Sequence, residues 1–495
     1  MRGVLRWMRW HPLPLLVWLL LATGCAPSLH SRGPLGALMA DGDAQTARCA
    51  NAWREVDDAI DLAGVRDGEA FRVPGQPWLR TTRTLAGLAR AGGSHTAGLV
   101  DQMRLLDAEA RGFELANLSE RAIDGLAARL GLSGRAAIAD TLARCGTRLH
   151  ARSAAAAALA TAVPDDYQTW KRAAGLYALT RLPFSRGVER YQRDTANVFE
   201  RPLEALEVRG TLVRHGAGPV PAGEPDAGLP TSIVAGAEPA PLQLEALFRR
   251  HAPVFEIDTT GPDDGIGQPA WGPDGIPFVD TGVPVMFVRS TRTLFGGKVL
   301  PQLVYSVWFP ARPKEGPFDL LGGRLDGITV RLTLDHEGRP LLVDTMHSCG
   351  CYHQFFPTAR LRMRPRPDSL DEWAFVPQSL PSPPPGTRLL LRVAAASHQI
   401  QRLRWAPALD IDRELALQPD DSLRSLPLPG GGRRSLFGPD GLVVGSERGE
   451  RWLFWPMGVR EPGAMRQWGR HATAFVGRRH FDDPDLPDRY FEPVP

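Results

Sequence analysis

Hydrophobic residues recur at helical spacing through the first half of the chain. The segments AQTARCANAWREVDDAIDLAGV, SHTAGLVDQMRLLDAEARGFELANL and SERAIDGLAARLGL each place apolar residues three or four positions apart, which is typical of amphipathic helices. Ser119 stands just before the third segment, where a helix N-cap is favoured. The stripe expected on the second segment consists of Leu99, Met103, Leu106, Ala110 and Phe113. The spacing therefore predicts a packed helical domain over residues 46–209.

From residue 246 onward the pattern changes to short runs of β-branched and aromatic residues. PVMFVRSTRTLF, QLVYSVWFPA, GITVRLTLD, RPLLVDTMHS and TRLLLRVAAA predict strands. LTLDHEGRPLLVD predicts a hairpin whose turn runs from Asp335 to Arg339. We also expect a strand in GERWLFWPMGV, residues 449–459.

The two halves are separated by a segment rich in Gly, Ala and Pro, residues 210–245, which predicts a linker. The expected fold class is α+β. A helical N-terminal domain, residues 46–209, is followed by a β-rich, mainly antiparallel C-terminal domain, residues 246–495. The chain has 495 residues, which is consistent with two domains.

The first residues are typical of an export signal. MRGVLRWMRWHPLPLLVWLLLATGC has a basic start, an apolar run from Leu13 to Ala22 and small residues before Cys25. The apolar run is too short for a comfortable transmembrane helix. The residues LATGC resemble the lipobox of bacterial lipoproteins, with Ala22 where that family prefers Leu.

The resemblance implies that residues 1–24 are a signal peptide that is cut off before Cys25. In that family the cysteine is diacylated on its thiol and then acylated on its new amine. Residues 25–45 would tether the lipid to the body of the protein. Ala26, and no Asp, follows the cysteine, which favours the outer membrane over retention at the inner membrane. We therefore expect a lipid-anchored protein of the bacterial envelope that faces the periplasm and whose membrane contact is its lipid.

Charge gives no indication of a nucleic-acid partner. The chain has 58 basic and 55 acidic residues, a net charge of +3. Removing the signal peptide takes away Arg2, Arg6 and Arg9, so that 55 basic residues face 55 acidic ones. A formally neutral chain without a dense basic stripe is not expected to bind nucleic acid.

The five cysteines divide naturally into three groups. If Cys25 carries lipid, four remain in an oxidising compartment. Cys349 and Cys351 are close in sequence, so the simplest long-range disulfide joins Cys49 to Cys145. Such a bridge would stabilise the fold by about 4 kcal/mol in the chain-entropy model.

The candidate chemistry lies in MHSCGCYHQFF, where His347, Cys349, Cys351 and His353 alternate. Two imidazoles and two thiolates suit zinc or copper(I). Along a straight strand these four side chains would span roughly 20 Å, too far for one ion. A metal site therefore needs a turn at Gly350. It would gain a further ligand from His471 or His480.

Two other interpretations remain open for this segment. Cys349 and Cys351 can form a small disulfide ring, either a static staple or a strained, easily reduced redox pair. Alternatively, one thiol can act with a histidine and an orienting acid such as Asp344. No other catalytic motif that we recognise is present.

These observations support two hypotheses about function. The first is an outer-membrane lipoprotein with a binding or structural role and a protein or small-molecule partner that the sequence does not identify. The second is a periplasmic metal-binding or thiol-redox enzyme centred on residues 347–353. The body of the chain resembles no family whose function we can name.

Overall fold

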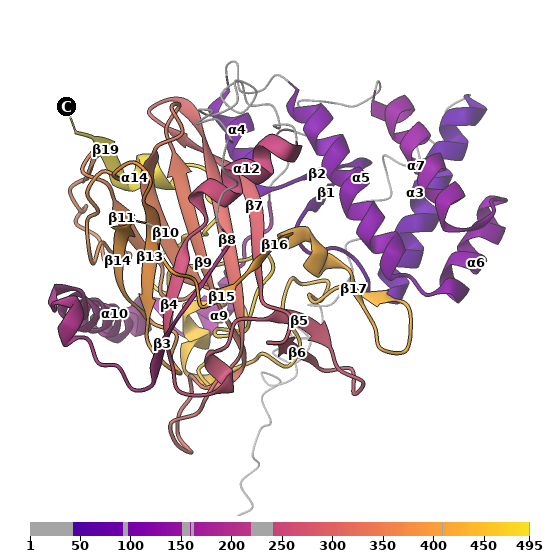
Figure 1. The fold of residues 1–495 in the computed structure, drawn as a ribbon. Helices are drawn as coiled ribbons and strands as arrows, with labels where there is room; N and C mark the ends of the chain where they lie inside the picture. The colour runs from indigo at the N-terminus through magenta and orange to yellow at the C-terminus, as the bar shows by residue number, and fades with distance from the viewer. Residues whose placement is uncertain are drawn as a thin grey trace, which may run out of the picture.

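The computed structural model confirms the predicted α+β fold, with helices in the first part of the chain and mainly strands in the second (Figure 1). The predicted signal peptide and the lipidation site at Cys25 lie outside the described residues, as does most of the tether. The structure describes residues 43–92, 98–150, 159, 163–218, 241–407 and 409–494.

The N-terminal helices pack around one apolar core. These helices are α3 (Ala44–Ala63), α4 (Arg83–Ala91), α5 (Leu99–Asn117), α6 (Glu120–Leu130) and α7 (Gly134–His150). Ser119 is the N-cap of α6, as predicted, and its hydroxyl accepts a hydrogen bond from the Ala122 N–H. The core side chains include Trp53, Val56, Ile60, Met103, Leu126, Ile138 and Leu142.

A short hairpin that the sequence did not predict completes this unit. It consists of β1 (Phe71–Val73) and β2 (Gln76–Thr81). Arg80 of β2 is fully buried and forms ion pairs with Asp107 at 3.0 Å and Glu114 at 2.6 Å, both on α5. The buried face of α5 is therefore partly charged. The predicted apolar stripe is correspondingly incomplete, because Leu106 and Phe113 are only half-buried.

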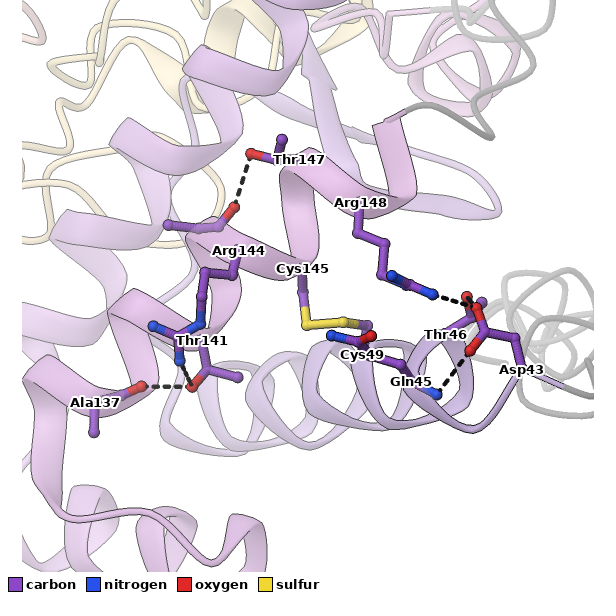
Figure 2. The surroundings of a disulfide bond; sticks show 11 residues. Asp43, Gln45, Thr46, Cys49, Ala137, Thr141, Arg144, Cys145, Thr147 and Arg148 are labelled. Carbon is purple, nitrogen blue, oxygen red and sulfur yellow. Dashed lines mark hydrogen bonds and ion pairs between the residues drawn. A yellow bond between two sulfur atoms is a disulfide. The ribbon is translucent and has the colours of Figure 1, made fainter.

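The predicted disulfide joins α3 to α7. The sulfur atoms of Cys49 and Cys145 lie 1.95 Å apart and the Cα atoms 5.3 Å apart. Figure 2 shows the bridge between the two helices, with Arg148 reaching from α7 to Asp43 at the start of α3. The bridge closes a loop of 96 residues, for which the chain-entropy model gives about 4.7 kcal/mol of stabilisation.

Two β-sheets form the C-terminal sandwich. In spatial order the six-stranded sheet is β11 (Gln354–Pro357), β10 (Pro340–His347), β9 (Gly323–Leu334), β8 (Lys298–Arg312), β7 (Val285–Phe295) and β16 (Ala416–Pro419). The five-stranded sheet is β14 (Ile400–Ala406), β13 (Arg388–Val393), β4 (Val254–Thr259), β3 (Thr211–Gly216) and β15 (Arg413–Glu414). Neighbouring strands are mostly antiparallel.

The main core lies between these sheets, because alternate residues of each strand point inward. It draws side chains from both sheets, including Phe255, Ile257, Tyr305, Phe309, Val330, Val343, Leu391 and Leu403. Helix α12 (Pro241–His251) adds Leu247 and Phe248, and the Phe248 carbonyl accepts a hydrogen bond from the Tyr305 hydroxyl at 3.0 Å. The smaller elements of this half are β5 (Gln268–Trp271), β6 (Pro277–Asp280), β12 (Leu361–Met363), β17 (Leu426–Pro427), β18 (Arg433–Arg434), α14 (Leu486–Tyr490) and β19 (Phe491–Pro493).

The division of the chain differs from the predicted one around residue 210. Residues 211–216, expected in the linker, form β3 and pair along their whole length with β4. Helices α9 (Thr169–Ala174) and α10 (Tyr177–Glu200) were assigned to the helical domain, yet they contact the C-terminal half. The Arg172 guanidinium of α9, for example, donates to the Met457 carbonyl at 2.8 Å. Partners distant in sequence therefore decide where these segments pack.

The prediction of a strand in residues 449–459 is wrong. This segment forms the short helix α13 (Arg451–Phe454) and a 3₁₀ turn, η6 (Trp455–Met457). Pro456 lacks a backbone donor and fits the first turn of a helix better than a sheet ladder. Its apolar residues do not alternate between two faces either, because Trp452 and Leu453 are both exposed. Among the described residues, no helix is long and apolar enough to cross a membrane.

Candidate functional site

The predicted hairpin of β9 and β10 places the His/Cys segment at one end of the six-stranded sheet. Its turn covers Asp335–Arg339, as expected, and the Asp335 carboxylate accepts hydrogen bonds from the N–H groups of Glu337 and Arg339, both at 2.9 Å. Every residue of β10 is buried. The strand ends at His347, two residues before Cys349.

Gly350 lies in a tight turn, as predicted. Its N–H donates to the His347 carbonyl at 2.8 Å, and the His347 N–H donates to the Cys351 carbonyl at 3.0 Å. The φ angle of Gly350 is +87°, and a Cβ atom there would lie 2.6 Å from the Ala472 carbonyl oxygen. Both the backbone conformation and the close approach of residue 472 require glycine.

The turn brings the two thiols together without joining them in this structure. Cys349 is buried and Cys351 is half-buried, and the Cys351 N–H donates to the Cys349 sulfur at 3.4 Å. A hydrogen bond between the side chains lowers the pKa of Cys349 and raises that of Cys351 well above its ordinary value. Cys349 is therefore the more acidic thiol of the pair.

His347 belongs to a buried polar network inside the sandwich. Its Nδ1 atom lies 3.5 Å from the Asp326 carboxylate, which also contacts Arg448 at 3.2 Å. His398 Nδ1 lies 2.8 Å from the second Asp326 oxygen, and its Nε2 lies 3.5 Å from Asp264. Burial raises the pKa of Asp326, but Arg448 and the histidines outweigh it and hold that pKa well below its ordinary value. The carboxylate therefore remains charged at the centre of the network.

His353 lies in a different network, next to Asp344. Its Nε2 atom is 2.9 Å from an Asp344 oxygen, and Arg331 binds both oxygens of the same carboxylate, at 3.0 and 2.6 Å. Burial lowers the pKa of His353 to about 4 despite the hydrogen bond with Asp344. The ring is therefore neutral at pH 7, and Nε2–H donates to the carboxylate. The other nitrogen, Nδ1, is buried and has no hydrogen-bond partner.

The predicted outside partners, His471 and His480, lie in two further environments. His471 is buried behind the turn, near Gly350, where burial lowers its pKa to about 3. His480 is 3.2 Å from Asp165 and packs edge-on against Tyr167. Within the described ranges, no group of three or more His, Cys, Asp or Glu side chains is placed to hold a metal ion.

Asp344 does orient a histidine, as the acid–base interpretation expected, but that arrangement is incomplete. Across the described part of the chain, no hydrogen bond joins His353 to either thiol. A nucleophile activated directly by this imidazole is therefore not assembled here.

An apolar cavity of about 460 Å³ lies beside the turn. Helix α10 forms one wall, and the turn, α13 and residues 472–475 form the others. Apolar and aromatic side chains dominate the lining, among them Phe184, Val188, Tyr191, Phe375, Leu453, Phe454 and Phe475. Cys349, Cys351 and His353 reach the same cavity. Three of the four alternating residues therefore line one space.

A few charged groups complete the lining. Burial raises the pKa of Glu450 to about 7, close to neutrality. The Glu372 carboxylate accepts hydrogen bonds from the N–H groups of Phe475 and Val476 at 2.6 and 2.9 Å, and Arg479 lies 3.7 Å away. The Glu372 carboxylate therefore already has its hydrogen-bond donors within the protein. Glu450 is the charged group of the lining most available to a bound molecule.

Glu450, Asp326, His398 and Arg448 belong to no motif that marks them in the sequence. A positive φ of 52° at His398 and the ring of Phe309 stacked on it at 3.9 Å are structural features without a local sequence pattern. No local sequence signal marks Glu450, which stands between Gly449 and Arg451.

The fold and the site define a β-sandwich protein with a helical N-terminal unit and a mainly apolar, thiol-lined cavity. Comparison with protein-family models, curated proteins and solved structures finds no match to this chain. The cavity and the side chains around it are therefore the features that indicate a function.

Proposed function

We propose that this protein is an envelope lipoprotein that binds a small, mainly apolar molecule in the cavity between α10 and the turn at Gly350. The cavity itself is the supporting observation. Its volume of about 460 Å³ falls in the usual range for small-molecule sites, roughly 300–1,000 Å³. The envelope location remains the expectation drawn from the lipobox around Cys25.

The chemistry of the lining indicates what kind of molecule fits. Most of the wall is aliphatic or aromatic, so burial of apolar surface would supply most of the binding free energy. His353 is neutral, and Glu450 has a pKa of about 7. A long apolar molecule with one hydroxyl or carboxyl group is therefore a better match than a highly charged one.

We expect Val188→Trp to weaken binding of the apolar fluorophore N-phenylnaphthylamine by about tenfold or more, equivalent to about 1.4 kcal/mol. Val188 lines the cavity from α10, and an indole there would fill part of the space. Fluorescence titration of residues 26–495, which include every described residue, gives the dissociation constant. Asn197→Trp places the same side chain on an exposed position of α10 outside the cavity. No saturable binding to the parent chain, or equal weakening by both substitutions, would contradict the proposal.

A second candidate is thiol–disulfide exchange, which the two neighbouring thiols favour. The Cys349 thiolate would attack a substrate disulfide and release one substrate thiolate. Cys351 would then give its proton to that thiolate and attack the Cys349 sulfur, releasing the second substrate sulfur. The substrate is reduced by two electrons and the cysteine pair is oxidised to a disulfide.

This candidate predicts a reversible change in the thiol count of residues 26–495. After treatment with dithiothreitol under native conditions, denatured protein should give two free thiols, from Cys349 and Cys351, because the long-range bridge is harder to reduce. After oxidised glutathione it should give none, and Cys349→Ser should prevent the change. Two thiols that glutathione does not oxidise would exclude exchange. Near-stoichiometric zinc or copper in elemental analysis would instead support the metal interpretation.

A further inference from the structure

The outer surface beside the cavity is unusually apolar. Exposed side chains from α9, the start of α10 and α13 form what we call the apolar rim, consisting of Trp170, Leu176, Leu179, Leu182, Trp452 and Leu453. Their exposed fractions range from 46% to 72%. A group of exposed tryptophan and leucine side chains indicates an interaction surface.

The three segments of the rim are held together by packing. Phe184 of α10 and Phe454 of α13 contact each other edge-on with ring centroids 5.5 Å apart. Lys171 of α9 and Arg451 of α13 both approach Glu461, at 3.7 and 3.9 Å. Figure 1 shows α10 along the outside of the sandwich, away from the N-terminal helices. Of its 24 residues only Ser185 and Phe199 are buried.

The charge around the rim is positive. Residues 170–194 and 451–461 contain three acidic residues, Glu189, Asp194 and Glu461. The more numerous basic residues of the same two segments are Lys171, Arg172, Arg181, Arg186, Arg190, Arg193, Arg451 and Arg460. The mature chain is expected to be neutral overall, so this excess is local. It would attract a surface that carries negative charge.

We infer that the apolar rim is a docking surface for an anionic lipid bilayer. Tryptophan favours the boundary between lipid headgroups and acyl chains, leucine side chains insert just below it, and arginines are attracted to anionic headgroups. An apolar stripe beside a basic helix face is the combination that binds the surface of a bilayer without crossing it. This docking does not depend on what the cavity holds.

Docking also suggests the class of molecule that the cavity takes, a step that rests on the proposed function. Leu453 belongs to the rim and also lines the cavity. The cavity is also lined by Pro183, which is exposed and follows the rim residue Leu182. The cavity therefore reaches the surface at the rim. A protein docked there would expose the cavity to acyl chains, and the ligand class we assign is a lipid or a free fatty acid.

The test is co-sedimentation of residues 26–495, which lack the expected lipidation site Cys25, with vesicles of equal parts phosphatidylethanolamine and phosphatidylglycerol. The parent chain should bind these vesicles, and the triple variant Trp170→Ser, Leu179→Ser, Trp452→Ser should bind about tenfold more weakly or not at all. All three side chains are more than 60% exposed, so the substitutions should leave the fold intact. Replacing Arg186, Arg190 and Arg193 by Gln should weaken binding and reduce its dependence on salt.

The matched control is Leu62→Ser with Leu242→Ser, which removes apolar side chains that are 91% and 81% exposed outside the rim. It should bind vesicles like the parent chain. No binding by the parent, equal binding by the rim variant, or equal binding to vesicles of phosphatidylcholine alone would overturn the inference. Val188→Trp should still bind vesicles, so a failure of ligand binding and a failure of docking give different results.

Discussion

Arg331→Met should lower the free energy of unfolding by about 3–5 kcal/mol, the usual cost of removing one partner from a buried ion pair. The Arg331 guanidinium holds both oxygens of Asp344 and also donates to the Phe481 carbonyl. Both side chains are almost fully buried, at 3% and 1% exposed. Removing the arginine would leave a buried, charged carboxylate with only His353 as its partner. Urea unfolding at neutral pH, followed by circular dichroism, measures the loss.

Two further variants make this prediction specific. Arg339→Met lies in the same hairpin, but its side chain is 61% exposed, so its loss should be below about 1 kcal/mol. The double variant Arg331→Met, Asp344→Leu removes both charges and should be more stable than Arg331→Met alone. A single Arg331 variant that unfolds at the same urea concentration as Arg339→Met would show that the pair contributes nothing.

Local sequence signals predicted the parts of the site that depend on neighbouring residues. The hairpin at Asp335–Arg339 follows from turn residues between two apolar runs. The turn at Gly350 follows from glycine between two side chains that had to approach each other. The Cys49–Cys145 bridge followed from counting cysteines and from the oxidising compartment that the lipobox resemblance implies. In each case the information lies within a few residues or in the number of residues of one type.

The distribution of the histidines was not predictable in this way. Asp344 and His347 are three positions apart on β10, so they point to opposite faces of the sheet. After the turn, His353 returns on the Asp344 side, because Asp344 pairs with Phe355 across the two strands. The alternating pattern therefore divides between two buried networks. Only the register of β10 with β11, which the sequence does not specify, decides this.

Pairings between distant segments account for the remaining differences. His398 is 72 residues from Asp326, and Arg448 is 122 residues from the same carboxylate. The sequence of helix α10 is typical of a helical domain. Its few inward-facing side chains nevertheless pack against the sandwich, where Phe199 contacts Phe356. An amphipathic pattern shows that one face of a helix is buried, but it does not show which element that face packs against.

Asp326→Asn should cost about 3–5 kcal/mol of unfolding free energy near pH 6, with a loss that shrinks at higher pH. The substitution leaves Arg448 and His398 without their shared carboxylate. Burial lowers the pKa of His398, but its hydrogen bonds to Asp264 and Asp326 outweigh burial and raise it above the ordinary value of 6.5. The protonated ring therefore stabilises the fold fully below pH 6.5, and that contribution is lost as the pH rises through the raised value.

The carboxylate itself gives the opposite dependence. Its pKa lies well below the ordinary value of 3.8, so its contribution is present above that value and is lost as the pH falls through the lowered one. The network is therefore most stabilising from just above pH 3.8 to pH 6.5.

Above that window the difference between the parent chain and Asp326→Asn should fall by up to about 1.4 kcal/mol per pH unit. Urea unfolding of both proteins from pH 4 upward through the window and above it measures this difference in unfolding free energy. The exposed Asp410→Asn is the control. A difference that is constant or grows with pH would show that His398 is not protonated next to Asp326, and the network would then depend on Arg448 alone for its positive charge.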